Sequence, residues 1–366
     1  MEKSAFIQYI DKFFKKIVLG IVNKLNGKNA ETLTYMFKEM LRVEFSVSGK
    51  WETISTHSTR VSADFVAMDS SLPLKMRDSL GKVSGDITKS GMELWLNEKQ
   101  LTELHDMRAL GIPESEIVAK LFADTPRVIT GIYELMEKCL LEGLSTGVTV
   151  IDDAENVGTG VRMDFGYLDE NKFGANVLWA NSDTAKPLDD FRRVIKKAQS
   201  KGNRPTQVYM DDVTFDNFVK AKQVREYFAW SLKFSGDLSA TPTPTLDEIN
   251  AALKKDQRYK LTIHVVDRTI INEKNGVRTT VTPWSEGKVV FTMSTKVGVL
   301  TWARLAEMSS KVAGVSYEIA DRYILVSMFR SNRPSLREFT TSQARVVPVI
   351  CDVEKIYLLD TKIIQA

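Results

Sequence analysis

The 366-residue sequence predicts an α+β fold in which an α/β block is inserted between two strand-rich regions. Strand-like alternation precedes and follows a strongly amphipathic helix pattern at residues 125–143. Helix and strand patterns then alternate between Pro187 and Met293, and strand patterns return from Tyr317 to Leu359. Because strands stand on both sides of the inserted block, we expect a discontinuous outer domain.

The helix predicted at residues 125–143 is the central brace of this scheme. Thr125 suits an N-cap, and Pro126 suits the first helical position, where its missing N–H would be unpaired anyway. Gly143 and Gly147 are both candidate stops. The apolar residues follow the i, i+3, i+4, i+7 spacing of one helix face: Val128, Ile129, Ile132, Leu135, Met136, Cys139 and Leu140.

Composition excludes several classes of protein. Charged residues make up 27% and hydrophobic residues 43%, which is typical of a globular chain. The net charge of +3 argues against a strong polyanion binder. Cys139 and Cys351 lie far apart in apolar contexts, so we expect buried free thiols of a reducing compartment and no zinc site.

The N-terminal region predicts a basic amphipathic helix over residues 4–26. Six lysines against Glu2 and Asp11 give the first thirty residues a charge of +4, which leaves −1 for the rest of the chain. Charges at Asp11 and Lys12 interrupt any signal-peptide core, and no run of 18 apolar residues predicts a membrane span. The helix could lie on a membrane, but we favour docking on a partner or on the protein's own body.

Residues 41–96 predict an extended region with an unusual tail. Arg42–Gly49 alternates in the strand manner, and Thr59–Asp69 continues in a similar style. Ser70–Leu94 is polar, charged and punctuated by glycines, with few residues to fill a core. A long connection of this kind is usually a functional loop or arm. A projecting two-stranded arm is only marginally stable in water, so it would need a partner surface.

The remaining elements follow from local signals. Thr245 and Glu248 have capping-box spacing, and Asn275-Gly276 is a hairpin turn signal. We expect helices at residues 97–110, 113–123, 187–201, 214–229 and 245–255. We expect strands at 148–152, 160–167, 176–179, 207–210, 261–267, 269–272, 278–282, 288–293, 317–320, 324–329, 337–344, 346–353 and 356–359.

Catalytic signals are weak, and we predict no catalytic, cofactor-binding or metal-binding residue and no enzyme activity. The three histidines have no metal-ligand spacing: His57, His105 and His264. Adjacent aspartates do not face one another on a helix or strand, which argues against acid–base dyads at Asp152-Asp153, Asp189-Asp190 and Asp211-Asp212. Asp189-Asp190 is better explained as the acidic first turn of a helix.

Two further patterns receive structural interpretations. The glycines of Asn156–Val161 lack the strand–loop–helix frame and the lysine of a phosphate loop, so we predict a turn. One helix carries a basic cluster that we interpret as a solvated face, since acids flank it and no aromatic series accompanies it: Arg192, Arg193, Lys196 and Lys197.

Several segments, in order, resemble a known family. Arg60–Ile87 is similar to the extended-loop region of tailed-phage major capsid proteins. Arg162–Tyr167 (RMDFGY), Val177–Arg193 (VLWANSDTAKPLDDFRR) and Val208–Phe218 resemble the lambda-type major capsid protein E family. Arg333–Asp360 is similar to its closing strands. The resemblance covers about residues 41–360 and implies the Hong Kong 97-like phage capsid fold.

The resemblance implies a division into an N-terminal arm (1–41), an extended loop or E-loop (42–96), a peripheral domain with a spine helix (97–184, helix 125–143), an axial domain (185–309) and a second peripheral part (310–366). It implies a major capsid protein that self-assembles into hexamers and pentamers of an icosahedral shell around the double-stranded DNA of a tailed phage. No coiled-coil prodomain is evident before the extended loop, so we expect a separate scaffolding protein, with a portal and possible cement protein as further partners. The implied location is the virion, assembled in the cytoplasm of a bacterial host.

The arm's interleaved charges are our candidates for subunit contacts, because polar, registered contacts set specificity more than affinity. These residues are Arg60, Lys75, Arg77, Asp78, Lys82, Asp86 and Lys89.

Three alternatives stay open from the sequence. An encapsulin-like compartment shell would share the fold but hold protein cargo, and neighbouring genes would separate the two. A soluble α/β enzyme would lose turnover on substitution of Asp211, Asp212 and His264. A membrane-surface protein would lose liposome binding without residues 1–28.

Overall fold

The computed structural model describes residues 2–26, 35–56, 80–151, 160–232, 243–333 and 335–365. The chain forms two compact units, each built from separated stretches of sequence. The first comprises Met1–Trp51, Gly85–Lys138 and Val299–Pro348, and the second Glu52–Ser84, Cys139–Gly298 and Val349–Ala366. Both units are interrupted in sequence.

Helix α5 (Thr125–Thr146) is the brace that the sequence predicts, three residues longer than expected. Gly147, with φ +83°, follows its last residue and stops the helix, whereas Gly143 lies inside it. The predicted apolar face is buried apart from the half-buried Leu135. Helix α5 also buries Glu137 and Lys138, so it is enclosed on more than one side.

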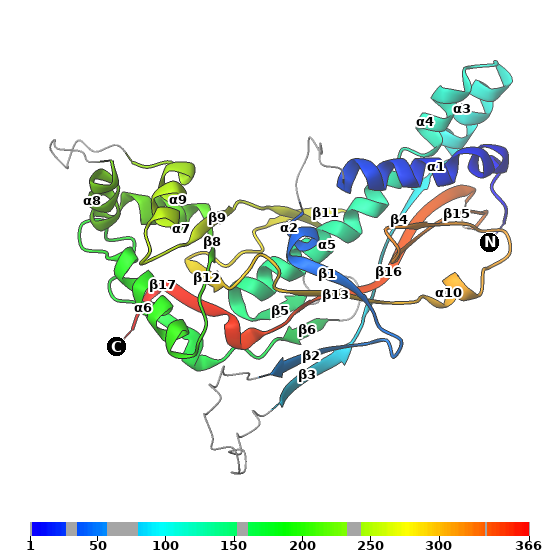
Figure 1. Cartoon of the computed structure of the whole chain (residues 1–366). Helices are drawn as coiled ribbons and strands as arrows, with labels where there is room; N and C mark the ends of the chain where they lie inside the picture. The colour runs from blue at the N-terminus through cyan, green and yellow to red at the C-terminus, as the bar shows by residue number, and fades with distance from the viewer. Residues whose placement is uncertain are drawn as a thin grey trace, which may run out of the picture. The chain divides into compact units, whose positions relative to one another are not determined.

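The first unit is built on one β-sheet. The strand order is β1 (Leu41–Phe45), β13 (Gly298–Ala303), β16 (Arg337–Ile350), β15 (Ile324–Ser331) and β14 (Ser316–Ala320), and β4 (Lys89–Leu96) pairs with β16 as well. Strand β16 takes β15 and β4 as antiparallel neighbours, and Figure 1 shows these three strands side by side. Its alternate residues therefore project from two opposite faces.

Helices cover one face of this sheet. Ser342 Oγ donates to the carbonyl oxygen of Val128 at 2.6 Å, which places α5 against β16. Helix α1 (Ile7–Asn26) lies against β14 and buries Tyr9, Ile10, Phe14 and Val18. The N-terminal helix therefore docks on the protein's own body, one of the two docking modes that the sequence left open. Helices α3 (Glu98–Ala109) and α4 (Glu114–Leu121) form a pair beside it (Figure 1).

The second unit holds the predicted α/β block. Its sheet runs β7 (Lys172–Ala175), β17 (Tyr357–Ile364), β12 (Lys288–Thr292), β8 (Gln207–Asp211) and β9 (Thr262–Val266). Around its core pack α6 (Pro187–Ser200), α7 (Asp212–Lys220), α8 (Lys222–Ser231) and α9 (Leu246–Lys255). In that core the Phe191 ring packs against Phe218 and Phe291, with ring centroids 5.2 and 5.1 Å away.

Smaller elements complete the described chain. Two hairpins are β5 (Val148–Ile151) with β6 (Val161–Asp164), and β10 (Ile270–Lys274) with β11 (Val277–Val281). Asn275 and Gly276 take φ +52° and +79°, which confirms the predicted turn. Strands β2 (Lys50–Thr56) and β3 (Leu80–Asp86) pair as a ribbon. The rest are α2 (Met36–Met40), α10 (Ala306–Ser309), η1 (Asp169–Asn171) and η3 (Val353–Lys355).

Three predicted elements are wrong. Residues 214–229 form two helices, because Ala221 takes extended ψ 132° and lets the Lys222 N–H donate to Ser182 O at 2.8 Å. The strand predicted at residues 176–179 does not form. The strand of this region is β7, which covers the four preceding residues, and residues 176–179 bend away from it. Residues 337–350 form one continuous strand where two were expected, with Arg345 inside it. In addition, α2, β13 and α10 were not predicted.

Candidate inter-subunit surface

The two ends of the predicted arm meet at one side chain, Arg345 of β16. The Ile87 N–H donates to the carbonyl oxygen of Gly49 at 3.0 Å, so the chain entering β2 touches the chain leaving β3. The Arg345 guanidinium donates from Nε to Ile87 O at 3.3 Å and from Nη2 to Gly49 O at 3.4 Å. One cation in the sheet therefore holds both ends of the arm, which we call the arm clamp.

Two glycines make the arm clamp geometrically possible. Gly49 takes φ +71°, and a Cβ there would lie 2.7 Å from Arg345 Nη2. A Cβ on Gly85 would lie 2.8 Å from the indole nitrogen of Trp51, whose side chain is buried. Both positions need a residue without a side chain, because the backbone approaches another group closely.

Strand β4 continues the arm directly into the sheet of the first unit. Its residues Lys89 to Leu96 pair one by one with Arg345 back to Glu338 of β16. Eight consecutive pairs fix the register, and a slip by one residue would turn every side chain to the opposite face. The residues that follow the arm, from Lys89 onward, are therefore fixed in register on β16.

Three of the seven candidate contact residues lie in the described part of the chain. Asp86 closes β3 and Lys89 opens β4, and both side chains are exposed on either side of Ile87. Lys82 lies in β3. The other four fall outside the described residues: Arg60, Lys75, Arg77 and Asp78. Asp86 and Lys89 are thus brought to the foot of the arm, beside the arm clamp.

The aspartates considered for chemistry have structural roles where they are described. Asp190 is fully buried in the first turn of α6 and accepts from Trp179 Nε1 at 3.0 Å and from the Asn176 N–H at 3.1 Å. Arg193 lies 3.2 Å from it, yet burial raises the pKa of the Asp190 carboxyl. Asp190 therefore ties the Trp179 turn to the helix, a role beyond the dipole effect predicted for the pair.

Asp211 likewise organises backbone. It caps α7 by accepting from the Thr214 N–H and hydroxyl at 3.0 and 2.5 Å, and it accepts from the Gly287 N–H at 3.1 Å. Its neighbour Asp212 accepts from the Val213 N–H. His264 Nε2 lies 2.7 Å from Gln207 Oε1 on the neighbouring strand. Asp211, Asp212 and His264 therefore each have a local structural partner.

The remaining sequence candidates are also placed. The His105 ring lies 4.8 Å from the Phe6 ring in the packing of α1. Neither cysteine forms a disulfide with a described residue, and Cys139 is buried and Cys351 half-buried. His57, Asp152-Asp153 and most of the Asn156–Val161 turn lie outside the described residues. Within the described ranges, no three His, Cys, Asp or Glu side chains gather as a metal site, and no helix is long and apolar enough to cross a membrane.

A polar network that the sequence did not suggest holds the N-terminal segment. Glu137 of α5 is buried and accepts from the backbone N–H groups of Met36 and Phe37, both at 3.0 Å, so it caps α2 from a distant helix. Asp321 accepts from Asn26 at 3.5 Å and Tyr133 at 2.7 Å, and it forms an ion pair with Lys38.

The electrostatics of Asp321 follow from these partners. Burial alone would raise the pKa of the Asp321 carboxyl, but Lys38 and the hydrogen bonds from Tyr133 and Asn26 together hold that pKa below its usual value. Asp321 and Arg322 also take positive φ of 50° and 71°. The local sequence around Asp321 does not predict this polar network, because the partners of Asp321 come from three distant stretches of the chain.

The described polar residues therefore serve packing, capping and the fixing of an arm, which is what an assembly protein requires of its subunit. A sequence model of the phage major capsid protein E family matches residues 117–342, more than half of the chain. The chain belongs to the phage major capsid protein E family, and it is a structural subunit of the phage capsid shell.

Solved structures confirm the fold. The putative capsid protein of a prophage from Escherichia coli CFT073 superposes with a TM-score of 0.58 at 12% identity, covering 94% of this chain and 98% of that one. A phage-related protein from Bordetella bronchiseptica RB50 superposes with a TM-score of 0.53 at 11% identity, covering 94% and 96%. A search of curated proteins gave no significant match. The predicted Hong Kong 97-like phage capsid fold is confirmed, and the family favours a capsid over the encapsulin-like and enzyme alternatives.

Proposed function

We propose that this chain assembles into hexameric and pentameric capsomers that close into an icosahedral shell around the double-stranded DNA of a tailed phage. The family match over residues 117–342 carries the proposal. The shell is built in the cytoplasm of a bacterial host, and the subunit has no enzymatic role. The five-part division into arm, extended loop, two peripheral parts and axial domain stays part of this proposal.

The arm clamp supports a contact between subunits. A two-stranded ribbon is marginally stable alone, whereas Arg345 and β4 fix the foot of this one on the sheet. We infer that the extended loop lies on the neighbouring copy through Arg60, Lys75, Arg77, Asp78, Lys82, Asp86 and Lys89. Exposed ion pairs contribute about 0–1 kcal/mol each, so many repeated contacts hold the shell.

Further partners follow from charge. A net charge of +3 on 366 residues suits a container that touches packaged DNA weakly and non-specifically. Lys15, Lys16 and Lys24 of α1 are exposed. These lysines are available to DNA or to a separate scaffolding protein, and a portal and a cement protein complete the expected set.

The direct test is expression of the full chain with and without a candidate scaffolding protein from the same phage. Electron microscopy of the purified material should show regular closed particles of one or a few sizes. The charge reversals Asp86→Lys and Lys89→Glu should leave the melting temperature unchanged and lower the yield of particles. If both variants gave the same particle yield as the parent chain, Asp86 and Lys89 would not belong to the contact.

A further inference from the structure

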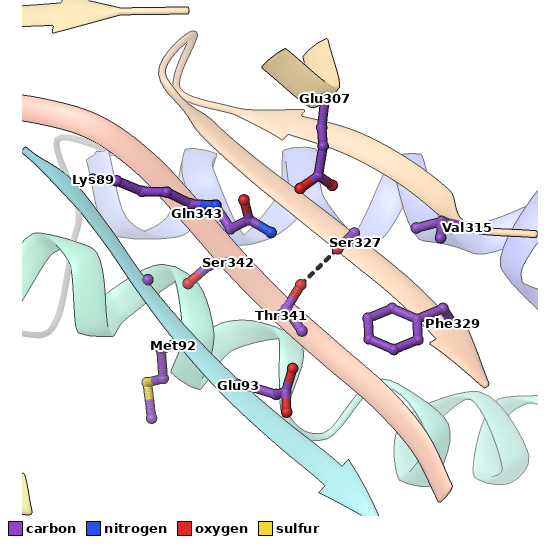
Figure 2. A pocket seen from close by; sticks show the side chains of 11 residues that line it. Lys89, Met92, Glu93, Glu307, Val315, Ser327, Phe329, Thr341, Ser342 and Gln343 are labelled. Atoms are coloured by element: carbon purple, nitrogen blue, oxygen red, sulfur yellow. Dashed lines mark hydrogen bonds between the residues drawn. The ribbon is translucent and has the colours of Figure 1, made fainter. Parts of the chain in front are cut away.

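A groove of about 290 Å³ lies on the first unit's sheet, on the face opposite α5 (Figure 2). Figure 2 shows β4, β16 and β15 forming its floor, with α10 above one rim and helices behind the sheet. The pairing of Glu93 with Thr341, and of Gly91 with Gln343, puts these residues on one face. Ser342 projects to the other face, where it bonds α5.

The groove is rich in hydrogen-bond acceptors. Of its eleven lining residues, Glu93 and Glu307 are acidic and Lys89 is basic, so the lining carries a net charge of −1. Partial burial raises the pKa of the Glu93 carboxyl, as expected for a carboxylate that is losing water. Glu307 points from α10 toward Ser327 and Thr341, and it accepts from the Tyr317 hydroxyl at 3.0 Å.

One acceptor in the groove lacks a donor. Gln343 Oε1 is buried, and none of the described residues donates a hydrogen bond to it. A buried acceptor without a partner costs about 1–3 kcal/mol, so such atoms usually have a partner in the functional state. By contrast, the Ser327 and Thr341 hydroxyls on the floor satisfy each other at 2.6 Å.

An aromatic row continues the same face beyond the groove. Trp95 follows Glu93 by two residues and is 47% exposed, with the Arg337 guanidinium 4.8 Å from its ring centroid. Phe339 lies between Trp95 and Phe329, with centroids 6.2 and 5.1 Å away. Exposed tryptophan, packed aromatics and arginine are the composition of protein–protein hot spots.

We propose that this groove receives a lysine or arginine side chain from a neighbouring copy of the chain in the shell, while the aromatic row packs against the same copy. Glu93, Glu307 and Gln343 Oε1 offer acceptors on two sides of the groove, and a cationic head group supplies donors and balances the charge. The inference rests on the proposed function, because only a shell of many copies brings a second chain to every such face.

A residue-specific photo-cross-linker tests the occupant. p-Benzoylphenylalanine replaces Val315, which lines the groove without contributing an acceptor. Particles are assembled from a 1:1 mixture of ¹⁴N- and ¹⁵N-labelled full chains, irradiated and analysed by mass spectrometry. We expect cross-linked peptide pairs of mixed isotope label in which the captured peptide contains lysine or arginine.

A charge variant tests the acceptors. The double substitution Glu93→Gln with Glu307→Gln should keep the melting temperature of the subunit and lower particle yield at least about tenfold, because two carboxylates that face a buried cation are lost. The matched control is Glu98→Gln with Glu116→Gln on α3 and α4. It also removes two carboxylates from the first unit, but neither of them lines the groove. The control should assemble normally. If the double variant does not fold, the cross-linking result decides alone.

The outcomes separate the two proposals. Normal particles, with only intrachain cross-links or none from position 315, would overturn the groove assignment and leave the capsid function intact. Cross-links to a different protein would also overturn it. If the unmodified chain forms no particles with or without its scaffold, the proposed function fails, and the inference fails with it.

Discussion

The Nη2 atom of Arg345 lies 3.4 Å from the carbonyl oxygen of Gly49, which also accepts from the Ile87 N–H at 3.0 Å. A strand in the sheet thereby holds the two ends of an excursion of more than thirty residues. Closing a loop of that length costs conformational entropy, and the clamp offsets part of that cost at the foot of the arm.

Replacing Arg345 with Met should separate folding from assembly. The variant loses donors to Gly49 and Ile87, which should lower the free energy of unfolding by about 1–3 kcal/mol. We expect a folded subunit in thermal melting and few closed particles by electron microscopy. Arg108→Met, at an exposed position of α3, is the control and should change neither. Normal particles from the Arg345 variant would show that the clamp is dispensable.

Asp190 and its neighbour Asp189 form a matched pair. Asp190→Ala leaves the Trp179 indole N–H and the Asn176 N–H without their acceptor in a buried place, so we expect a loss of about 2–4 kcal/mol in urea unfolding. Asp189→Ala removes only a half-buried first-turn acid and should cost about 0.3–1 kcal/mol. Equal effects would contradict the structural role given to Asp190.

Two carboxyls of the first unit, the buried Glu338 and the half-buried Asp321, should change the pH dependence of stability with opposite sign. Burial raises the pKa of Glu338, which is 1% exposed, so its contribution to stability is complete below the ordinary carboxyl pKa of about 4 and is lost as pH rises through the folded value. Glu338→Gln should therefore gain stability relative to the parent chain as pH rises from 4 to 8. Denaturant unfolding at several pH values measures this slope.

Asp321 supplies the opposing case in the same experiment. Its folded pKa is held low by Lys38 and its hydrogen-bond donors, so its contribution is present above the ordinary carboxyl pKa and is lost as pH falls through the folded value. Asp321→Asn should lose stability relative to the parent near neutral pH, and the difference should shrink below pH of about 4. If the stability difference from the parent chain changed with pH in the same direction for both variants, the environments described for Glu338 and Asp321 would be refuted.

Glycine positions give a test of backbone geometry. Gly147 stops α5 with φ +83°, and a Cβ there would lie 2.8 Å from the Tyr167 ring. Gly147→Ala should destabilise the subunit by about 1–3 kcal/mol in thermal unfolding. Gly20→Ala, in the middle of α1 with open space around it, should stabilise by about 0.5–1 kcal/mol. A neutral Gly147 variant would show that the helix end is not constrained.

Sequence reasoning succeeded where signals are local. The α5 pattern, the Asn275-Gly276 turn and the Thr245–Glu248 capping box are encoded in neighbouring residues, and all three are present. It failed where a distant partner decides. Helix α2 has only five residues and takes its cap from Glu137, a hundred positions away. The break at Ala221 depends on a hydrogen bond to Ser182, and β13 is a strand because β1 and β16 flank it.

The candidate site shows the same limit. Charge interleaving identified Asp86 and Lys89 near the foot of the arm, but Arg345 gave no signal, because it lies between the two strands predicted at 337–344 and 346–353, and 258 positions from Ile87. Gln343 and Glu93 become neighbours only through the β4–β16 register. Pairing of strands so far apart in sequence cannot be read from local propensity.

The most direct test of the account is electron microscopy, with light scattering, of the purified full chain expressed alone and with the scaffolding protein proposed above. We predict regular, closed, megadalton particles in at least one of the two preparations. A strictly monomeric protein in both would contradict the assignment as a shell-forming capsid subunit.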